Sequence, residues 1–380
     1  MDIEVEVADS VSSVPRASWD ALVGADNPFV EHAFLSLLED SESVGAGTGW
    51  LPAPILVRTE GRLIGAAPAY VKSDSYGEYI FDWSFAQAAA RARIPYYPKL
   101  VVAVPFTPAT GPRLLVHPDF EASVIRRALL AGMNRLRQAT QSSSIHILFS
   151  PADEAHALSE LGLLHRTTHQ YHFTNPGYGS FDDFLGELRS EDRKQIRRER
   201  RKVSEQGIET ELRRGDQLSV EEWSILFELY TSTSGRKWGR PYLTRAFFER
   251  ASAYVGHRAL VGFARDRRGE ILAGTLSFEK GACVYGRYWG SFGELDGVHF
   301  ELCYYQLIDH LIRTKKSLLE AGAQGEHKIK RGFRPSPTHS LHHFESSGLA
   351  RAAARAFHAE SAELPGLLET LSTHLPFRRR

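Results

Sequence analysis

Residues 321–333 hold the densest group of chemically active side chains in the chain. The group lies between glycines, directly after a predicted strand, and consists of Gln324, Glu326, His327, Lys328 and Arg331. Because α/β sheets bind ligands just past the ends of their strands, we expect this segment to form part of an active centre. The alternative is a polar loop that leads into a short helix.

Glu326 and His327 are the two proton-transfer candidates, because a carboxylate or an imidazole can take a proton from an attacking amine. We prefer Glu326, since Gly325 gives its backbone freedom. Burial would have to raise the pKa of Glu326 against the neighbouring cations Lys328 and Arg331. In the structural alternative, Glu326 only neutralises a buried arginine.

Residues 285–291, YGRYWGS, predict a second wall of the same site. In a strand, Tyr285, Arg287 and Trp289 share one face, and the glycines between them let a ligand or another backbone approach closely. We expect Arg287 to orient a carboxylate or phosphate and Trp289 to line the pocket. A buried arginine needs a partner, and Glu301 in the next predicted helix is the candidate.

The loop at 237–244, KWGRPYLT, combines aromatic residues, glycine and proline with two cations. Loops of this composition line ligand clefts. We expect Lys237 to orient an anionic group and Trp238 to wall the pocket. Alternatively, the loop only connects two helices and Trp238 packs between them.

A basic segment at 189–202 carries eight Arg and Lys against three acids. Apolar spacing predicts one long helix over 181–206, with Ser180 as its N-cap. Its cations suit a phosphate or carboxylate, and those expected to bind an anionic donor are Arg193, Arg197, Arg200 and Arg201. A solvated helix face is the equally open alternative.

The first half of the chain offers no comparable group of charged residues near a predicted strand end. Its segment 75–118 is rich in aromatic residues and proline and is predicted to be irregular. We expect this insertion to close the cleft and to shape the choice of acceptor through Tyr76, Glu78, Asp82 and Trp83.

An internal repeat indicates that the elements behind these residues form two related α/β units. GRLIGAAPAY from Gly61 matches GEILAGTLSF from Gly269, and residues 161–173 parallel residues 331–344 in the same order. In the first pair, each segment follows a predicted hairpin turn and enters a strand. One hairpin is predicted at 54–74, and three antiparallel strands are predicted at 258–291.

Length and turn signals set the expected domain bounds. A chain of 380 residues suggests two domains, and Asn175-Pro176-Gly177 is a strong turn. We therefore expect an N-terminal domain at 1–174, a C-terminal domain with the active site at 175–360, and a tail at 361–380.

Composition narrows the class of protein. The 46 Lys and Arg balance the 46 Asp and Glu, which excludes a globally basic nucleic-acid coat. Two cysteines exclude a disulfide framework. The acidic N-terminus is no signal peptide and no apolar run is long enough to span a membrane, so we expect a cytoplasmic protein. The spacing of His339, His342 and His343 fits no zinc signature, and we predict no metal.

Several stretches together resemble a bacterial family of predicted N-acyltransferases, described as FemAB-like, within the GNAT superfamily. The resemblance spans about residues 25–345 and is carried by NPFVEHAFLSLLEDSESVG with TGW, SYGEYIFDW, YYPKLVVAVPFTPATGPRLL, RKQIRRERRK, KWGRPYLT, YGRYWG, HFELCYYQ and AQGEHKIKRGF. It implies an α/β (α+β) fold of tandem GNAT-like domains, each a mixed, mainly antiparallel sheet flanked by helices.

Fem-type enzymes transfer an amino acid from aminoacyl-tRNA to an amine on a peptidoglycan precursor. The resemblance therefore implies transfer of an acyl or aminoacyl group from an activated donor to a primary amine of a peptide or peptidoglycan-like acceptor. Acyl-CoA or aminoacyl-tRNA would be the co-substrate. With aminoacyl-tRNA as donor, tRNA would be a partner. No tightly bound cofactor is expected. The helix at 189–206 is similar to the segment that opens the second GNAT domain of Fem-type enzymes.

Two features depart from the families that the chain resembles. Residues 209–256 are too short for the long coiled coil that Fem enzymes often carry. In residues 290–301, Glu294 and Asp296 stand where GNAT enzymes cradle the CoA pyrophosphate on backbone N–H groups, and they would repel it, which argues against plain acetyl-CoA. The alternatives to an enzyme are an inactive GNAT-fold module that binds a peptidyl or cell-wall precursor ligand, and a structural scaffold. Donor, acceptor and oligomeric state stay open.

Overall fold

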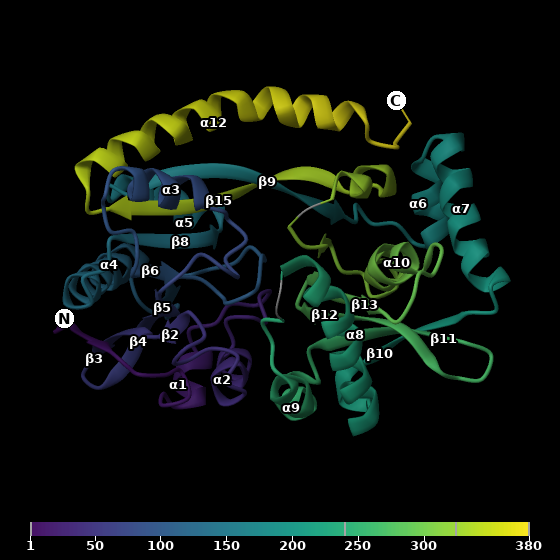
Figure 1. Cartoon of the computed structure of the whole chain (residues 1–380), viewed down its shortest axis with the longest axis horizontal. Helices are drawn as coiled ribbons and strands as arrows, with labels where there is room; N and C mark the ends of the chain where they lie inside the picture. Colours follow the sequence, from purple (N-terminus) through teal and green to yellow (C-terminus); the bar gives the residue numbers. More distant parts are fainter. Residues whose placement is uncertain (1, 239–240, 324, 379–380) are drawn as a thin grey trace. The chain divides into compact units, whose positions relative to one another are not determined.

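The computed structural model folds into two compact units of mixed α/β structure (Figure 1). It describes residues 2–238, 241–323 and 325–378, with the side chains of helix α8 only as far as residue 233. The first unit comprises residues 1–169 and 337–365, and the second comprises 170–336 and 366–380. Both the predicted C-terminal domain and the predicted tail therefore contribute residues to the first unit.

The first unit contains a four-stranded antiparallel sheet and a second, mixed sheet. The order of the first sheet is β1 (Glu4–Val7), β3 (Ile55–Thr59), β4 (Arg62–Ala67) and β7 (Leu115–Val116). In this unit the second sheet runs β15 (Arg334–Phe344), β8 (Ser144–Ser150), β6 (Lys99–Val102), β5 (Ala69–Lys72) and β2 (Trp50–Pro52). Only β6 and β8 pair in parallel in that sheet. The hairpin predicted from residue 54 is confirmed as β3 and β4, which turn at Glu60 and Gly61.

Helices cover these sheets and enclose an aliphatic core. They are α1 (Arg16–Asp20), α2 (His32–Asp40), α3 (Trp83–Arg91), α4 (Ala122–Ala139), α5 (Ala152–Glu160) and the first part of α12 (Ser347–Thr373). The prediction that 75–118 is irregular was wrong, because this segment contains α3, β6 and β7. The apolar run that starts at Lys99 makes β6 an inner strand whose four residues are all buried.

The second unit is built on one sheet that is antiparallel except at one pair of strands. Its order is β10 (Glu209–Arg214), β11 (Ala259–Arg265), β12 (Ile271–Lys280), β13 (Cys283–Ser291), β14 (Leu318–Glu320) and the end of β9 (Leu164–Thr174). The three strands predicted at 258–291 are confirmed as β11 to β13, with glycine at both turns. The exception is the parallel pair of β13 and β14.

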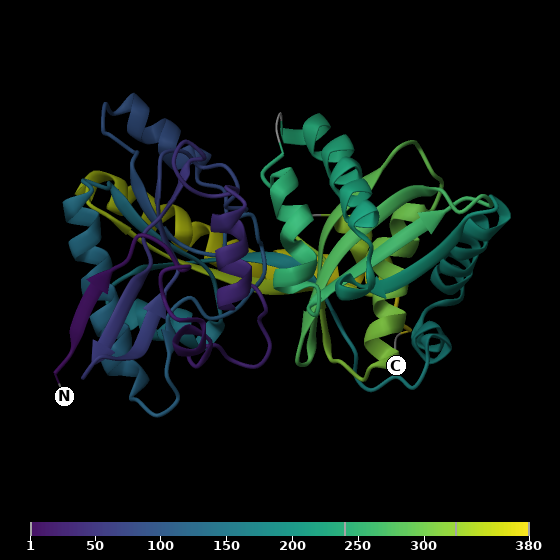
Figure 2. The same cartoon turned by 90° about the horizontal axis from the view of Figure 1, so that it is seen from below.

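Helices pack on both faces of this sheet. They are α6 (Phe181–Glu187), α7 (Ser190–Glu205), a 3₁₀ turn (Gly215–Gln217), α8 (Val220–Trp238), α9 (Arg245–Val255), α10 (Val298–Phe300), a π-helical turn (Glu301–Tyr305), α11 (Gln306–Arg313) and a 3₁₀ helix (Glu326–Arg331). Figure 2 shows α8, in teal, lying across the green strands of the sheet. In the parts of the chain that the structure describes, no helix combines the length and apolarity needed to cross a membrane.

The single helix predicted over 181–206 is broken into α6 and α7. Leu188 and Arg189 are extended, with ψ values of 153° and 150°. Leu188 forms an isolated β-bridge with Phe377, and the Arg189 N–H donates to the carbonyl of Pro376 at 2.8 Å. The backbone of these two residues therefore pairs with the C-terminal segment instead of continuing the helix.

The second match of the sequence repeat, residues 161–173 with 331–344, corresponds to the two longest strands, β9 and β15. The first match falls on β4 and β5 in one unit and on the single strand β12 in the other. Both β9 and β15 pass from one unit into the other. The end of β9 pairs with β14 in the second unit, and the end of β15 pairs with β8 in the first. Each sheet is thus completed by a strand that extends from residues of the other unit.

Candidate active site

The candidate site of the second unit lies where β13 and β14 separate. The two strands pair over three positions, the last being Tyr285 with Glu320, and β14 then ends while β13 continues. Just past this point a Cβ on Gly286 would lie 3.6 Å from Cα of Ala321. The two predicted walls, 285–289 and the segment that leads into the 3₁₀ helix, therefore meet at one sheet edge.

A β-bulge in β13 changes the predicted arrangement of its side chains. The register of β12 steps from Tyr288 to Gly286, so Arg287 is the extra residue of the bulge. Because directly paired residues share a face, Tyr285 and Tyr288 lie on one face and Trp289 on the other. The prediction that Tyr285, Arg287 and Trp289 share a face was wrong, since the bulge interrupts the period of two.

Aromatic contacts follow this division of the strand. The ring of Tyr288 packs edge-on against Tyr230 of α8, with centroids 5.1 Å apart. On the opposite face, Trp289 packs edge-on against His299 at 5.2 Å. Tyr285 is buried, whereas Arg287 is half-buried and lies 5.2 Å from the ring of Tyr288.

Lys328 brings a buried amine to the point where the strands separate. Its side chain points inward from the 3₁₀ helix, and Nζ donates to the carbonyl of Gly322 at 2.9 Å. Burial lowers the pKa of Lys328 to about 8. Burial also raises the pKa of the nearby Cys303 thiol, although the charge of Lys328 opposes this rise. The raised pKa keeps the thiol protonated at neutral pH.

Glu326 and His327 lie on the same 3₁₀ helix as Lys328 but are exposed. A hydrogen bond of 2.8 Å joins Nε2 of His327 to the hydroxyl of Tyr304. The burial that the prediction for Glu326 required is absent. The structure thus brings both proton-transfer candidates beside a buried amine, and their catalytic roles stay predictions.

Arg331 is tied to α7 rather than to Glu326. Its Nη2 donates to both carboxylate oxygens of Glu199 at 2.9 Å, and its guanidinium lies 3.4 Å from the ring centroid of Phe300. The hydroxyl of Tyr305 also donates to Glu199. This buried network anchors the 3₁₀ helix, which makes Arg331 a positioning residue for the site.

Glu301 was predicted to pair with Arg287, but in the structure it pairs with Arg200. Arg200 donates to both carboxylate oxygens, at 3.0 and 2.9 Å, and its guanidinium lies 4.7 Å from the ring of Phe181. Burial raises the pKa of Glu301, and the charge of Arg200 opposes that rise. The sequence pattern missed this pair because the two residues lie on separate helices, far apart in the chain.

The other cations predicted to bind a donor keep more accessible positions on α7. Arg197 pairs with Asp182 at 3.0 Å and Arg201 with Glu205 at 3.7 Å, and both pairs are exposed. Arg193 is half-buried. Exposed ion pairs contribute little to stability, so these arginines can exchange their partners for an anionic ligand. Their role in donor binding stays a prediction.

Glu78 and Asp82 of the insertion do not line a cleft but lie inside the first unit. Both contact the fully buried Nζ of Lys99, with Oε2 of Glu78 at 2.8 Å. Burial raises the pKa of Glu78 to about 7 even though Lys99 opposes it. Burial also raises the pKa of Asp82, but the charge of Lys99 and hydrogen bonds from Lys99 and Ser75 together outweigh burial and lower this pKa to about 2. Lys72, with its pKa lowered by burial to about 8, completes the cluster.

The remaining predicted residues are divided between the surface and the undescribed segments. The exposed Tyr76 packs edge-on against Trp83, with centroids 5.0 Å apart, as neighbours within the first unit. The side chains of Lys237 and Trp238, and all of Gln324, lie outside the described residues.

The prediction that the first half lacks a dense charged group was wrong. Lys72 and Lys99 escaped notice because Lys72 is the last residue of one apolar strand, AYVK, and Lys99 is the first residue of another, KLVV. A lysine at the end of a strand is usually solvated. A signal for this cluster was available in the sequence. Two acids, Glu78 and Asp82, lie between two lysines that stand at the ends of buried strands. His172 was also missed: its Nε2 lies 3.9 Å from Glu320, and burial, with help from the charge of Lys328, lowers its pKa to about 4.

Comparisons with solved structures agree with this fold. FemX has a TM-score of 0.56 at 13% identity, over 93% of this chain and 99% of that one. A conserved protein of unknown function from Bacteroides thetaiotaomicron VPI-5482 has a TM-score of 0.52 at 11% identity, over 89% and 99%. L-PGS from Bacillus licheniformis has a TM-score of 0.50 at 11% identity, over 94% and 99%. No curated protein matches the chain by sequence.

Mixed sheets flanked by helices, in two units, define an α/β protein whose fold is similar to that of FemX. The family model for FemAB-like proteins, described as peptidoglycan biosynthesis/recognition, matches residues 10–379. The chain therefore belongs to the FemAB-like family, and this membership supports a transferase.

Proposed function

We propose that the protein is an N-acyltransferase or aminoacyltransferase. It would move an acyl or aminoacyl group from acyl-CoA or aminoacyl-tRNA to a primary amine of a peptide or peptidoglycan-like acceptor. The observation that carries the proposal is the separation of β13 from β14 beside the buried amine of Lys328. Family membership supports a transferase, and the site offers groups suited to acyl transfer.

The proposed reaction needs no covalent enzyme intermediate. The acceptor amine attacks the carbonyl carbon of the donor thioester or ester, and a tetrahedral oxyanion forms. Backbone N–H groups of β13 beyond Tyr285, where β14 no longer pairs with it, stabilise the oxyanion together with the ammonium of Lys328. Glu326 or His327 takes the proton from the amine. The C–S or C–O bond then breaks, and the leaving group takes up a proton.

The exposed arginines of α7 are proposed to contact an anionic part of the donor. Reversing Arg197 and Arg201 to Glu is expected to weaken donor binding and to flatten its salt dependence, without loss of the fold. Affinity unchanged at low salt would assign these arginines to a solvated helix face. A cytoplasmic location is part of the proposal, since it is where both donor classes occur.

A donor panel tests the proposed function. The protein is incubated with acetyl-CoA, longer acyl-CoAs and charged tRNAs, each with amine-bearing peptide acceptors, and release of free CoA or uncharged tRNA is measured. Acceptor-dependent release supports the transferase. Saturable binding of a peptidyl ligand without turnover on the whole panel would favour the inactive binding module instead.

A further inference from the structure

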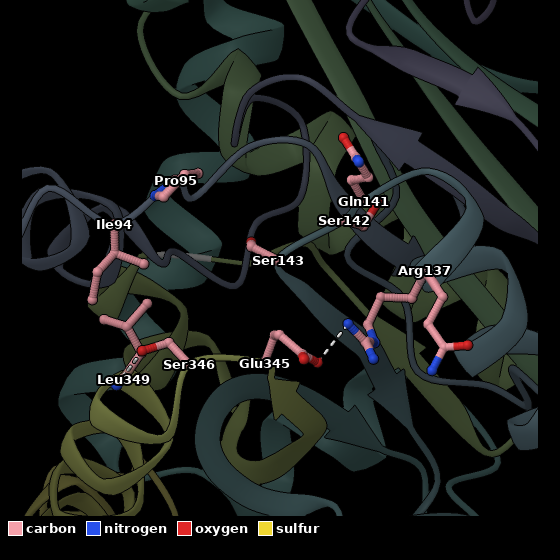
Figure 3. Close-up of a pocket in the computed structure, with 10 residues that line it drawn as sticks. Ile94, Pro95, Arg137, Gln141, Ser142, Ser143, Glu345, Ser346 and Leu349 are labelled. Atoms are coloured by element: carbon pink, nitrogen blue, oxygen red, sulfur yellow. Dashed lines mark hydrogen bonds and ion pairs between the residues drawn. The ribbon is translucent and has the colours of Figure 1, made fainter.

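A cavity of about 510 Å³ lies within the first unit, and its lining includes none of the residues assigned above (Figure 3). It is bounded by the segment after α3, the end of α4 with the turn that follows, and the start of α12. The lining residues are Ile94, Pro95, Arg137, Gln138, Gln141, Ser142, Ser143, Glu345, Ser346 and Leu349. Its size falls within the range of small-molecule sites, which combine an apolar wall with a few placed polar groups.

The cavity contains a buried cation. Arg137 is 8% exposed, and its Nε has no hydrogen-bond partner among the described residues. A buried guanidinium keeps its charge and needs an anionic partner, so the position favours an anion at the Nη1 side, where Glu345 now lies. The N-terminal end of α12, a helix of 27 residues, lies at the same cavity and also favours negative charge.

The present partner of Arg137 is a side chain that can leave at low cost. Nη1 lies 2.6 Å from Oε2 of Glu345, whose side chain is 63% exposed (Figure 3). Glu345 therefore regains most of its hydration when it turns away. Its carboxylate marks the position and the chemical type of anion that the guanidinium accepts.

The opposite part of the lining is apolar. Ile94, Pro95 and Leu349 offer aliphatic surface, and the amides of Gln138 and Gln141 stand nearer the rim. Planar Arg groups bind carboxylates in a two-pronged geometry, and aliphatic walls add hydrophobic contact. The arrangement suits a molecule with a carboxylate at one end and an aliphatic group at the other.

We propose that this cavity is a binding site for a small aliphatic carboxylate, such as an N-acylated amino acid, which displaces Glu345 from Arg137. The proposal does not depend on the proposed transferase function, since none of the lining residues belongs to that site.

The test compares three probes by isothermal titration calorimetry: N-acetylleucine, its neutral amide, and inorganic phosphate. We expect saturable binding of N-acetylleucine and at least tenfold weaker binding of the amide. Equal binding of the acid and the amide would overturn the role of Arg137. Binding of phosphate alone would overturn the proposed aliphatic carboxylate, and so would binding of none of the three.

Variants then locate the site. Glu345→Gln is expected to tighten N-acetylleucine binding several-fold because it removes the competing carboxylate, and Arg137→Gln is expected to weaken it at least tenfold. Arg135→Gln, an exposed change of the same charge on the same helix, is the matched control and is expected to bind as the wild type does. Because Glu345 is exposed, Glu345→Gln is expected to fold, and it tests the site even if Arg137→Gln does not fold. Unchanged binding in Glu345→Gln would overturn the proposal.

Discussion

Lys72 and Lys99 stand directly opposite each other on β5 and β6, and both side chains are fully buried. Glu78 lies between the two ammonium groups, with Oε2 2.8 Å from Lys99 and Oε1 4.0 Å from Lys72. Like charges on directly paired residues destabilise a sheet, and the ionised carboxylate of Asp82, paired with Lys99, offsets part of that repulsion. The stability of the first unit is therefore linked to pH.

Glu78→Gln is expected to reduce the pH dependence of stability between about 4.5 and 7. Burial raises the pKa of Glu78 to about 7, so the wild-type carboxyl contributes stability at low pH that is lost as the pH rises through 7. The loss amounts to about 3 kcal/mol, and the variant lacks it.

Urea unfolding at a series of pH values measures this difference. Glu4→Gln, at an exposed position in the same unit, is the control and should follow the wild type. Parallel pH curves for Glu78→Gln and the wild type would contradict the raised pKa.

Lys328→Met is expected to abolish a gain in stability that the wild type shows at alkaline pH. Because burial lowers the pKa of Lys328 to about 8, its ammonium costs stability below pH 8. That cost disappears as the pH rises from 8 towards the pKa of the unfolded chain, a change of about 3 kcal/mol. Lys330→Met, at an exposed lysine of the same 3₁₀ helix, is the control. Equal slopes for the two variants between pH 8 and 10 would refute the prediction.

Arg200→Ala is expected to destabilise the protein by about 2 kcal/mol or more, because it leaves the buried carboxylate of Glu301 without its partner. Arg201→Ala, which removes an exposed pair with Glu205 on the same helix, should change the free energy of unfolding by less than about 0.5 kcal/mol. Similar denaturation midpoints for the two variants would mean that the Arg200–Glu301 pair is not structural.

Gly290→Ala is expected to cost about 3 kcal/mol of stability. A Cβ at this position would lie 1.8 Å from the carbonyl oxygen of Leu229, so α8 would have to move away from β13. At Gly293 a Cβ would meet no atom within 4 Å, and Gly293→Ala is the control. Thermal unfolding compares them, and an unchanged midpoint for Gly290→Ala would show that α8 does not pack this closely.

The sequence was sufficient to predict most elements of the second unit and the correspondence of the segments that form β9 and β15. Alternating apolar patterns flanked by glycine turns identified β11 to β13, since both the period and the turns are local signals. The exchange of β9 and β15 between units was not predictable in this way. A strand pattern does not specify which sheet the strand joins when two related sheets are present.

The composition of the candidate site was predicted better than its geometry. Glu326, His327 and Lys328 lie at the expected sheet edge, but only Lys328 is buried. The bulge at Arg287 was missed because it depends on the register with β12, which a single strand does not encode. The partner of Glu301 was missed for a related reason, since Arg200 becomes its neighbour only through tertiary packing.

The mass of a peptide acceptor after incubation with the donor panel tests the central claim most directly. The account predicts an increase equal to one acyl or aminoacyl group, at an amine, with at least one donor. It also predicts that Glu326→Gln lowers this turnover by about 10² to 10⁴ while the thermal midpoint stays within a few degrees. An acceptor mass that never changes, in a folded protein that still binds a peptidyl ligand, would contradict the account.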